Sequence, residues 1–177
     1  MIRSALASLI VGLVLPVVAS AQSVFINEIH YDNVSTDTNE AVEVAGPAGT
    51  SLAGWSLVLY NGNGGASYAT YPLSGTISNT CAGFGAVSVA TPGIQNGSPD
   101  GVALVNALSQ VVQFLSYEGT MIATDGPANG MQSVDILVIE DGTEPTSSSL
   151  QLVGTGTVYP DFTWSEATAS PNACNAG

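Results

Sequence analysis

The stretch "WSLVLYNGNGGASYATY" (55–71) contains the clearest fold signal in the sequence. Its first six residues partly alternate between apolar and polar side chains, which is typical of a strand with one buried face. Two Asn-Gly dipeptides follow, and Asn-Gly supplies the positive φ angles that a tight turn between two strands needs. A second run of β-favouring residues then ends at Tyr71. The stretch therefore predicts a β-hairpin with strands at 55–60 and 67–71.

The same combination of short β-favouring runs and turn dipeptides continues along the chain. Further Asn-Gly and Asp-Gly pairs begin at Asn96, Asn129, Asp100, Asp125 and Asp141. No window has the periodicity of a capped amphipathic helix. Many short strands at this spacing predict an all-β protein, either a sandwich or a barrel. We expect strands at 24–30, 40–45, 55–60, 67–71, 84–90, 101–105, 110–116, 134–139, 149–153 and 161–164.

The first residues have the pattern of a cleavable export signal. Arg3 precedes an apolar run from Ala5 to Val18, and Ala19-Ser20-Ala21 matches a signal-peptidase cleavage site. The run of about 14 residues is shorter than the roughly 20 that a membrane-spanning helix needs. We therefore predict a signal peptide at 1–21 and a single domain at 22–177. The protein would be secreted or periplasmic, without insertion into a membrane.

The charge balance excludes several classes of partner. The sequence contains 14 Asp and Glu residues but one Lys or Arg, and that one is Arg3 in the predicted leader. Nucleic acids and anionic membrane surfaces are bound largely through Lys and Arg, which also clamp phosphate groups in enzymes. We therefore expect no nucleic-acid partner, and a neutral partner, a cationic partner or a metal ion stays open. A simpler explanation of the acidity is solubility.

The two cysteines, Cys81 and Cys174, predict one disulfide in an oxidising compartment. Their spacing fits neither a C-x-x-C redox motif nor a zinc site. In the chain-entropy model, closing a loop of this length contributes on the order of 4 kcal/mol to stability. Such a bond would tie the segment 171–177 to the body of the domain.

Several blocks of the sequence, in order, resemble the lamin tail domain as found in exported bacterial proteins. They are "NEIHYDN" (27–33), "EAVEVAGP" (40–47) and "LAGWSLVLYNG" (52–62), followed by "GIQNGSPDGVALVN" (93–106) and "VVQFLSYEGTMIATDGPANGMQSVDI" (111–136). The resemblance runs from about Val24 to Asn172. It implies an immunoglobulin-like β-sandwich and no established enzymatic activity of the domain itself. In that family the module often accompanies an extracellular nuclease or phosphatase domain, or surface-anchoring segments.

Acidic residues concentrate after the first expected strand. Five of them, Glu28, Asp32, Asp37, Glu40 and Glu43, fall within 16 residues, with no Lys or Arg to offset their repulsion. If strands 24–30 and 40–45 are neighbours, these oxygens come together, and calcium binds six to eight such oxygens in flexible geometry. We therefore predict a calcium ion bound by Asp32, Asp37, Glu40 and Glu43, in an irregular loop that Asp100 could complete. The alternative is an acidic loop whose carboxylates point into water.

The remaining conspicuous side chains have simpler interpretations. We expect His30, the only histidine, to be a strand-end residue, and Trp55 and Trp164 to be core residues. Around the "NGNGG" turn, cross-strand packing is the expected role of the tyrosines, with an exposed aromatic patch for carbohydrate or protein as the alternative. These tyrosines are Tyr60, Tyr68 and Tyr71. A second acidic group is expected at the surface, and it consists of Asp135, Glu140, Asp141 and Glu144.

These observations predict a non-catalytic module with a binding or structural role outside the cytoplasm, whose partner is an unidentified protein or carbohydrate at the cell exterior. No G-x-S-x-G motif is present, and a single histidine excludes a His-based metal centre. The alternative is a calcium-assisted extracellular hydrolase of glycosides or phosphoesters that uses acidic residues. Glycoside hydrolysis needs two carboxylates facing a cleft, and Glu28 with Glu43 could in principle be such a pair, although nothing in the sequence places them at a suitable separation.

Overall fold

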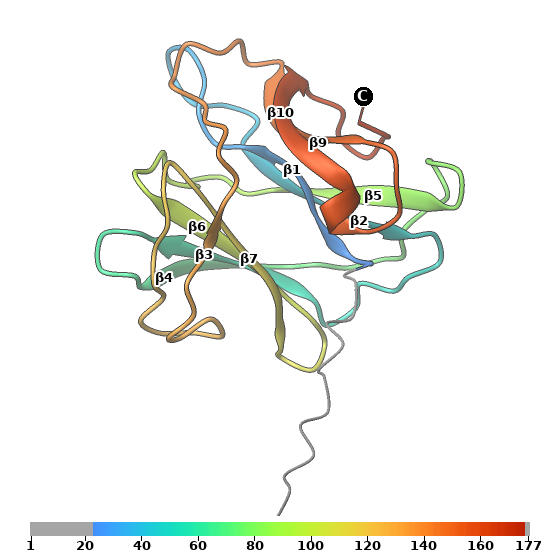
Figure 1. Ribbon diagram of the computed structural model, residues 1–177, viewed down its shortest axis with the longest axis horizontal. Helices are drawn as coiled ribbons and strands as arrows, with labels where there is room; N and C mark the ends of the chain where they lie inside the picture. Colours follow the sequence, from blue (N-terminus) through green and yellow to red (C-terminus); the bar gives the residue numbers. More distant parts are fainter. Residues whose placement is uncertain (1–22, 176–177) are drawn as a thin grey trace, which may run out of the picture.

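A computed structural model describes residues 23–175, which fold into two five-stranded sheets (Figure 1). The first sheet has the order β10-β9-β1-β2-β5, and the second has the order β4-β3-β6-β7-β8. The predicted all-β sandwich is therefore confirmed, whereas the predicted signal peptide at 1–21 lies outside the described residues. The strands are β1 (Phe25–His30), β2 (Ala41–Pro47), β3 (Ser56–Asn61), β4 (Ser67–Pro72), β5 (Phe84–Ala90), β6 (Asp100–Val105), β7 (Val111–Tyr117), β8 (Val134–Asp135), β9 (Ser148–Gly154) and β10 (Phe162–Thr168).

Each of the ten predicted strands has a counterpart, and one prediction was largely wrong. The strand expected at 134–139 ends after Asp135. The Asp135 Oδ1 atom accepts a hydrogen bond from the Leu137 amide at 2.9 Å, and Leu137 itself has a φ of 64°. A side chain that bonds its own backbone two residues on makes a turn instead of extending a ladder. Leu137 and Ile139 are consequently exposed.

The hairpin predicted at 55–71 is confirmed, with β3 and β4 antiparallel. Gly64 and Gly65 adopt positive φ angles in the turn. Tyr60 is fully buried, as cross-strand packing requires, while Tyr68 and Tyr71 are half-buried. The hydroxyl of Tyr68 accepts from the Gln95 amide, and that of Tyr71 donates to the Pro92 carbonyl. Packing within the domain is therefore confirmed for Tyr60.

The main core lies between the sheets and is built from the apolar residues of their facing strands. Trp164 is 8% exposed and belongs to this core, as predicted. Trp55 is partly buried against the core and precedes β3, which begins at Ser56. Across the sheets, the rings of Tyr31 and Tyr117 stack with centroids 3.9 Å apart. Apolar contact between the two sheets is thus what fixes their relative position.

The predicted disulfide is confirmed. Cys81 and Cys174 are bonded across a sequence separation of 93, which fastens the C-terminal segment beside β5. Between residues 23 and 175, no helix has the length and apolar character to cross a membrane.

Candidate functional site

The polar side chains of β1 owe their placement to an irregularity in the strand. Ile26 and Ile29 both belong to the core although they are three residues apart. This is compatible with a strand because the register with β2 shifts between Ile26 and Glu28. After the shift, Glu28 and His30 flank the core residue Ile29 along the strand, so their side chains lie on the face opposite to the core. The strand therefore carries two ionisable groups on the outer face of the first sheet.

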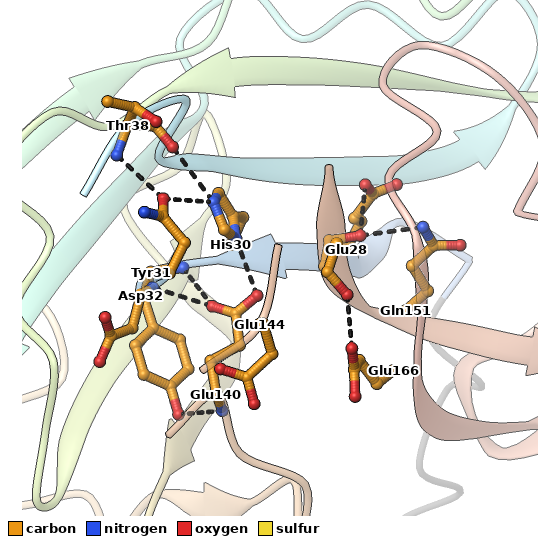
Figure 2. Close-up of polar contacts among 12 residues, drawn as sticks. Glu28, His30, Tyr31, Asp32, Thr38, Glu140, Glu144, Gln151 and Glu166 are labelled. Carbon is orange, nitrogen blue, oxygen red and sulfur yellow. Dashed lines mark hydrogen bonds and ion pairs between the residues drawn. The ribbon is translucent and has the colours of Figure 1, made fainter. Parts of the chain in front are cut away.

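His30, the last residue of β1, lies in a buried polar network. Its Nδ1 atom is 2.7 Å from Glu140 Oε1, and its Nε2 atom is 3.1 Å from the Thr38 carbonyl and 3.3 Å from Asn33 Oδ1 (Figure 2). The side chains of His30 and Glu140 are 6% and 0% exposed. His30 is thus a strand-end residue, as predicted, and it also forms a buried ion pair that the sequence did not reveal.

The partners of His30 determine its protonation. Asn33 donates through Nδ2 to the carbonyls of Val34 and Thr36 and accepts the Thr38 amide through Oδ1, so its amide orientation is fixed. Both ring nitrogens of His30 therefore face acceptors, and both need a proton to bond them. Burial alone would lower the pKa of His30, but the hydrogen bond and charge of Glu140 outweigh it and raise the pKa above 6.5. Residues 23–175 contain no Lys or Arg, so His30 is the one side chain among them that can carry a positive charge.

The prediction that the second acidic group lies at the surface was wrong for Glu140, which is fully buried. Besides His30, its carboxylate accepts the backbone amides of Tyr31 at 2.7 Å and Asp32 at 2.9 Å. Its own amide donates to the Tyr31 hydroxyl at 2.7 Å. The chain leaving β1 exposes these donors where no neighbouring strand accepts them, and Glu140 supplies the acceptor from about 110 residues away. In the same group, Asp141 is exposed, while Asp135 and Glu144 are half-buried.

The structure brings together only part of the predicted calcium set. Asp32 and Asp37 interact: burial and the charge of Asp37 raise the pKa of Asp32, while a hydrogen bond from Asn96 lowers the pKa of Asp37. Glu40 instead accepts a hydrogen bond from the Gly93 amide at 2.8 Å. Glu43, on the outer face of β2, accepts a hydrogen bond from the Asn27 side chain. Across residues 23–175, no group of three or more His, Cys, Asp or Glu side chains is arranged to hold a metal ion.

Asp100, which was expected to complete the calcium site, has another role. It is 3% exposed, and its two oxygens accept the amides of Gly62 and Gly97. It thereby joins the β3–β4 turn to the loop before β6. The calcium ion stays a prediction, with the pair Asp32 and Asp37 as the place where two of its four expected ligands do meet.

Glu28 and Glu43 are direct cross-strand neighbours, and both are buried. Glu28 accepts hydrogen bonds from Ser149 Oγ at 2.8 Å, the Ser170 amide at 3.0 Å and Ser170 Oγ at 3.1 Å. Glu43 accepts from Asn27 Nδ2 at 3.0 Å and from the Asn172 amide. Burial, opposed by these bonds, raises the pKa of Glu43 to about 7. The C-terminal segment is therefore held on the sheet by two carboxylates as well as by the disulfide.

A cavity of about 370 Å³ lies beside this pair. Glu28, His30 and Glu43 contribute to its walls, together with residues 146–148, 168, 169 and 171. Two neighbouring carboxylates of which one titrates near neutral pH are the groups that general acid–base chemistry uses. Each carboxylate oxygen of Glu43, however, already accepts a hydrogen bond from the chain itself.

No family model, no curated protein and no solved structure matches the chain. The resemblance to the lamin tail domain therefore stays a prediction, and the fold class is what the structure itself establishes.

Proposed function

We propose that this protein is an exported, non-catalytic β-sandwich module of the lamin-tail type with a binding or structural role at the cell exterior. One observation carries the proposal: the groups able to do acid–base chemistry are buried and bonded by the chain's own donors and acceptors. Glu140 neutralises His30 and caps the backbone after β1, while Glu28 and Glu43 fasten the C-terminal segment. Such bonds are what a structural network needs, and they occupy both carboxylate oxygens of Glu28, Glu43 and Glu140.

Export is supported by the chemistry of the disulfide. Bonds such as Cys81–Cys174 persist in oxidising compartments and are rare in a reducing cytosol. The leader-like sequence of residues 1–21 points the same way.

A protein partner is supported over a carbohydrate by the distribution of exposed apolar side chains. Within 23–175, five of the seven exposed large hydrophobic residues lie in the segment 122–139: Ile122, Met131, Val134, Leu137 and Ile139. Contiguous exposed apolar surface is typical of protein-binding sites, and Met131 and Val134 of this segment line one hollow. The tyrosines that would serve a carbohydrate are buried or half-buried, with their hydroxyls bonded within the domain.

A screen of purified protein on glycosides and phosphoesters tests the non-catalytic role. The wild-type protein should show no turnover that depends on Glu28 or Glu43, while E28Q and E43Q should change stability. Turnover abolished by E28Q or E43Q, but retained by a control substitution at the exposed Glu166, would overturn the proposal.

The second candidate, an extracellular hydrolase, is favoured by one specific observation. Glu28 and Glu43 are adjacent, Glu43 has a pKa of about 7, and both line the 370 Å³ cavity with His30. In that case Glu43 would be the general acid and Glu28 the second carboxyl group of the pair. The same screen decides this candidate, because its turnover would fall as the pH rises above 7.

A further inference from the structure

The outer face of the first sheet carries a second, largely apolar hollow that the polar network does not use. Its volume is about 250 Å³, and three phenyl rings stand around it, those of Phe25, Phe84 and Phe162. Two small side chains, Ala45 and Ala86, also line it. Ala45 of β2 lies between Phe25 of β1 and Ala86 of β5 in one cross-strand row. A larger residue at either position would fill the space, so the hollow exists because the row has alanines there.

The C-terminal segment forms one wall of this hollow. Cys174 and its partner Cys81 both line it, as does Asn175. Asn175 is fixed in turn, because its Nδ2 atom donates to the carbonyls of Asn27 and Leu152 at 3.0 and 2.9 Å. The wall is thus held covalently and by hydrogen bonds, which keeps the hollow open in the folded protein and makes it a preformed site.

One polar group at the hollow lacks a partner. Asn27 lines it and is 6% exposed; its Nδ2 atom donates to Glu43, and its Oδ1 atom is buried without any hydrogen bond. While Glu43 is ionised, the amide cannot be reversed without placing its oxygen against the Glu43 carboxylate. A buried acceptor left unpaired costs about 1–3 kcal/mol, so a donor that a ligand in the hollow brought to Asn27 would relieve that cost.

We propose that this hollow binds a small ligand with a single ring or a short aliphatic body and one N–H or O–H donor directed at Asn27. An apolar cavity of about 150 Å³ suffices for benzene, so 250 Å³ admits a ring with a short substituent. The ligand is neutral or cationic, because Glu43 is next to Asn27 and the domain has no Lys or Arg to bind an anion. This site is separate from the apolar segment 122–139 and does not depend on the function proposed above.

Four probes of one size test the site: benzyl alcohol, benzylamine, toluene and benzoate, titrated at pH 8 and followed by amide chemical shifts and by the melting midpoint. Benzyl alcohol and benzylamine should bind saturably, shift the amides around Asn27 and Ala86, and raise the midpoint. Toluene has no donor group, so it should bind about 2- to 10-fold more weakly than benzyl alcohol, a difference that corresponds to one net hydrogen bond. Benzoate should not bind.

Filling the hollow provides the matched control. A86L should abolish binding of benzyl alcohol, whereas A90L, at the exposed end of the same strand, should leave it unchanged. If A86L fails to fold, A45L on the neighbouring strand serves the same purpose. The proposal is overturned if none of the four probes binds saturably up to about 10 mM, or if the filled variant binds as well as the wild type. Equal binding of toluene and benzyl alcohol would contradict the role of Asn27.

Discussion

Replacing Glu43 with glutamine should remove much of the pH dependence of folding stability. The pKa of this buried carboxyl is about 7 in the folded protein, against 4.5 for the free group. The folded state therefore holds the proton more tightly than the unfolded state. The stabilisation that this raised pKa gives the folded state is fully present below about pH 4.5 and is lost as the pH rises through 7. At about 1.36 kcal/mol per pKa unit, the total loss is on the order of 3 kcal/mol, of which about 2 falls between pH 5 and 7.

Urea unfolding of the wild type and E43Q at pH 5, 6, 7 and 8 measures this effect. The glutamine has no charge to bury, so its stability should be nearly flat from pH 5 to 6.5, below the range in which His30 deprotonates. At pH 5 it should be about 1 kcal/mol less stable than the wild type, because its side-chain NH₂ faces one of the two N–H donors that Glu43 accepts. E166Q, at an exposed position on β10, should keep the wild-type slope. The reasoning fails if E43Q and the wild type lose stability in parallel between pH 5 and 7.

Three further predictions concern the ion pair, the disulfide and the predicted calcium ion. E140Q leaves the His30 imidazolium buried without its counter-charge and should cost about 3–5 kcal/mol in urea unfolding at pH 6; a loss below about 1 kcal/mol would contradict a buried ion pair. C174S should lower stability by up to about 4 kcal/mol, and the denatured, unreduced wild type should show no free thiol. Calcium at millimolar concentration should raise the melting midpoint through Asp32 and Asp37, so that D37N abolishes the shift; a midpoint that is the same in calcium and in chelator would reject the predicted site.

The sequence predicted those parts of the fold that depend on local rules. The hairpin of β3 and β4 followed from an Asn-Gly turn between two β-favouring runs, because a positive φ and alternation are properties of neighbouring residues. The disulfide followed from there being only two cysteines. The strand expected at 134–139 failed for an equally local reason, namely the turn that Asp135 makes with the Leu137 amide, which the apolar residues of the segment obscured.

The polar network could not be predicted because its partners are far apart in the sequence. Glu140 is separated from His30 by 110 residues, and Ser170 is separated from Glu28 by 142. No periodicity or spacing relates such positions, so Glu140 appeared to be one more surface acid. One feature of the sequence did point to the ion pair. The predicted domain has 14 acids, no Lys or Arg and a single histidine, so only that histidine can offset the charge of a buried carboxylate. An acid paired with His30 was therefore to be expected, although its identity was not.

With an acceptor at each ring nitrogen, His30 is expected to be a buried imidazolium that serves as the internal counter-charge of the domain. Because the chain has one histidine, ¹⁵N and ¹H NMR of the imidazole across pH 5–9 reports on this residue without assignment. We predict that both ring nitrogens carry a proton at pH 7 and that the ring titrates at a pKa above 6.5, with loss of stability as the pH rises through that pKa. A single neutral tautomer at pH 7, with a pKa at or below 6.5, would contradict it.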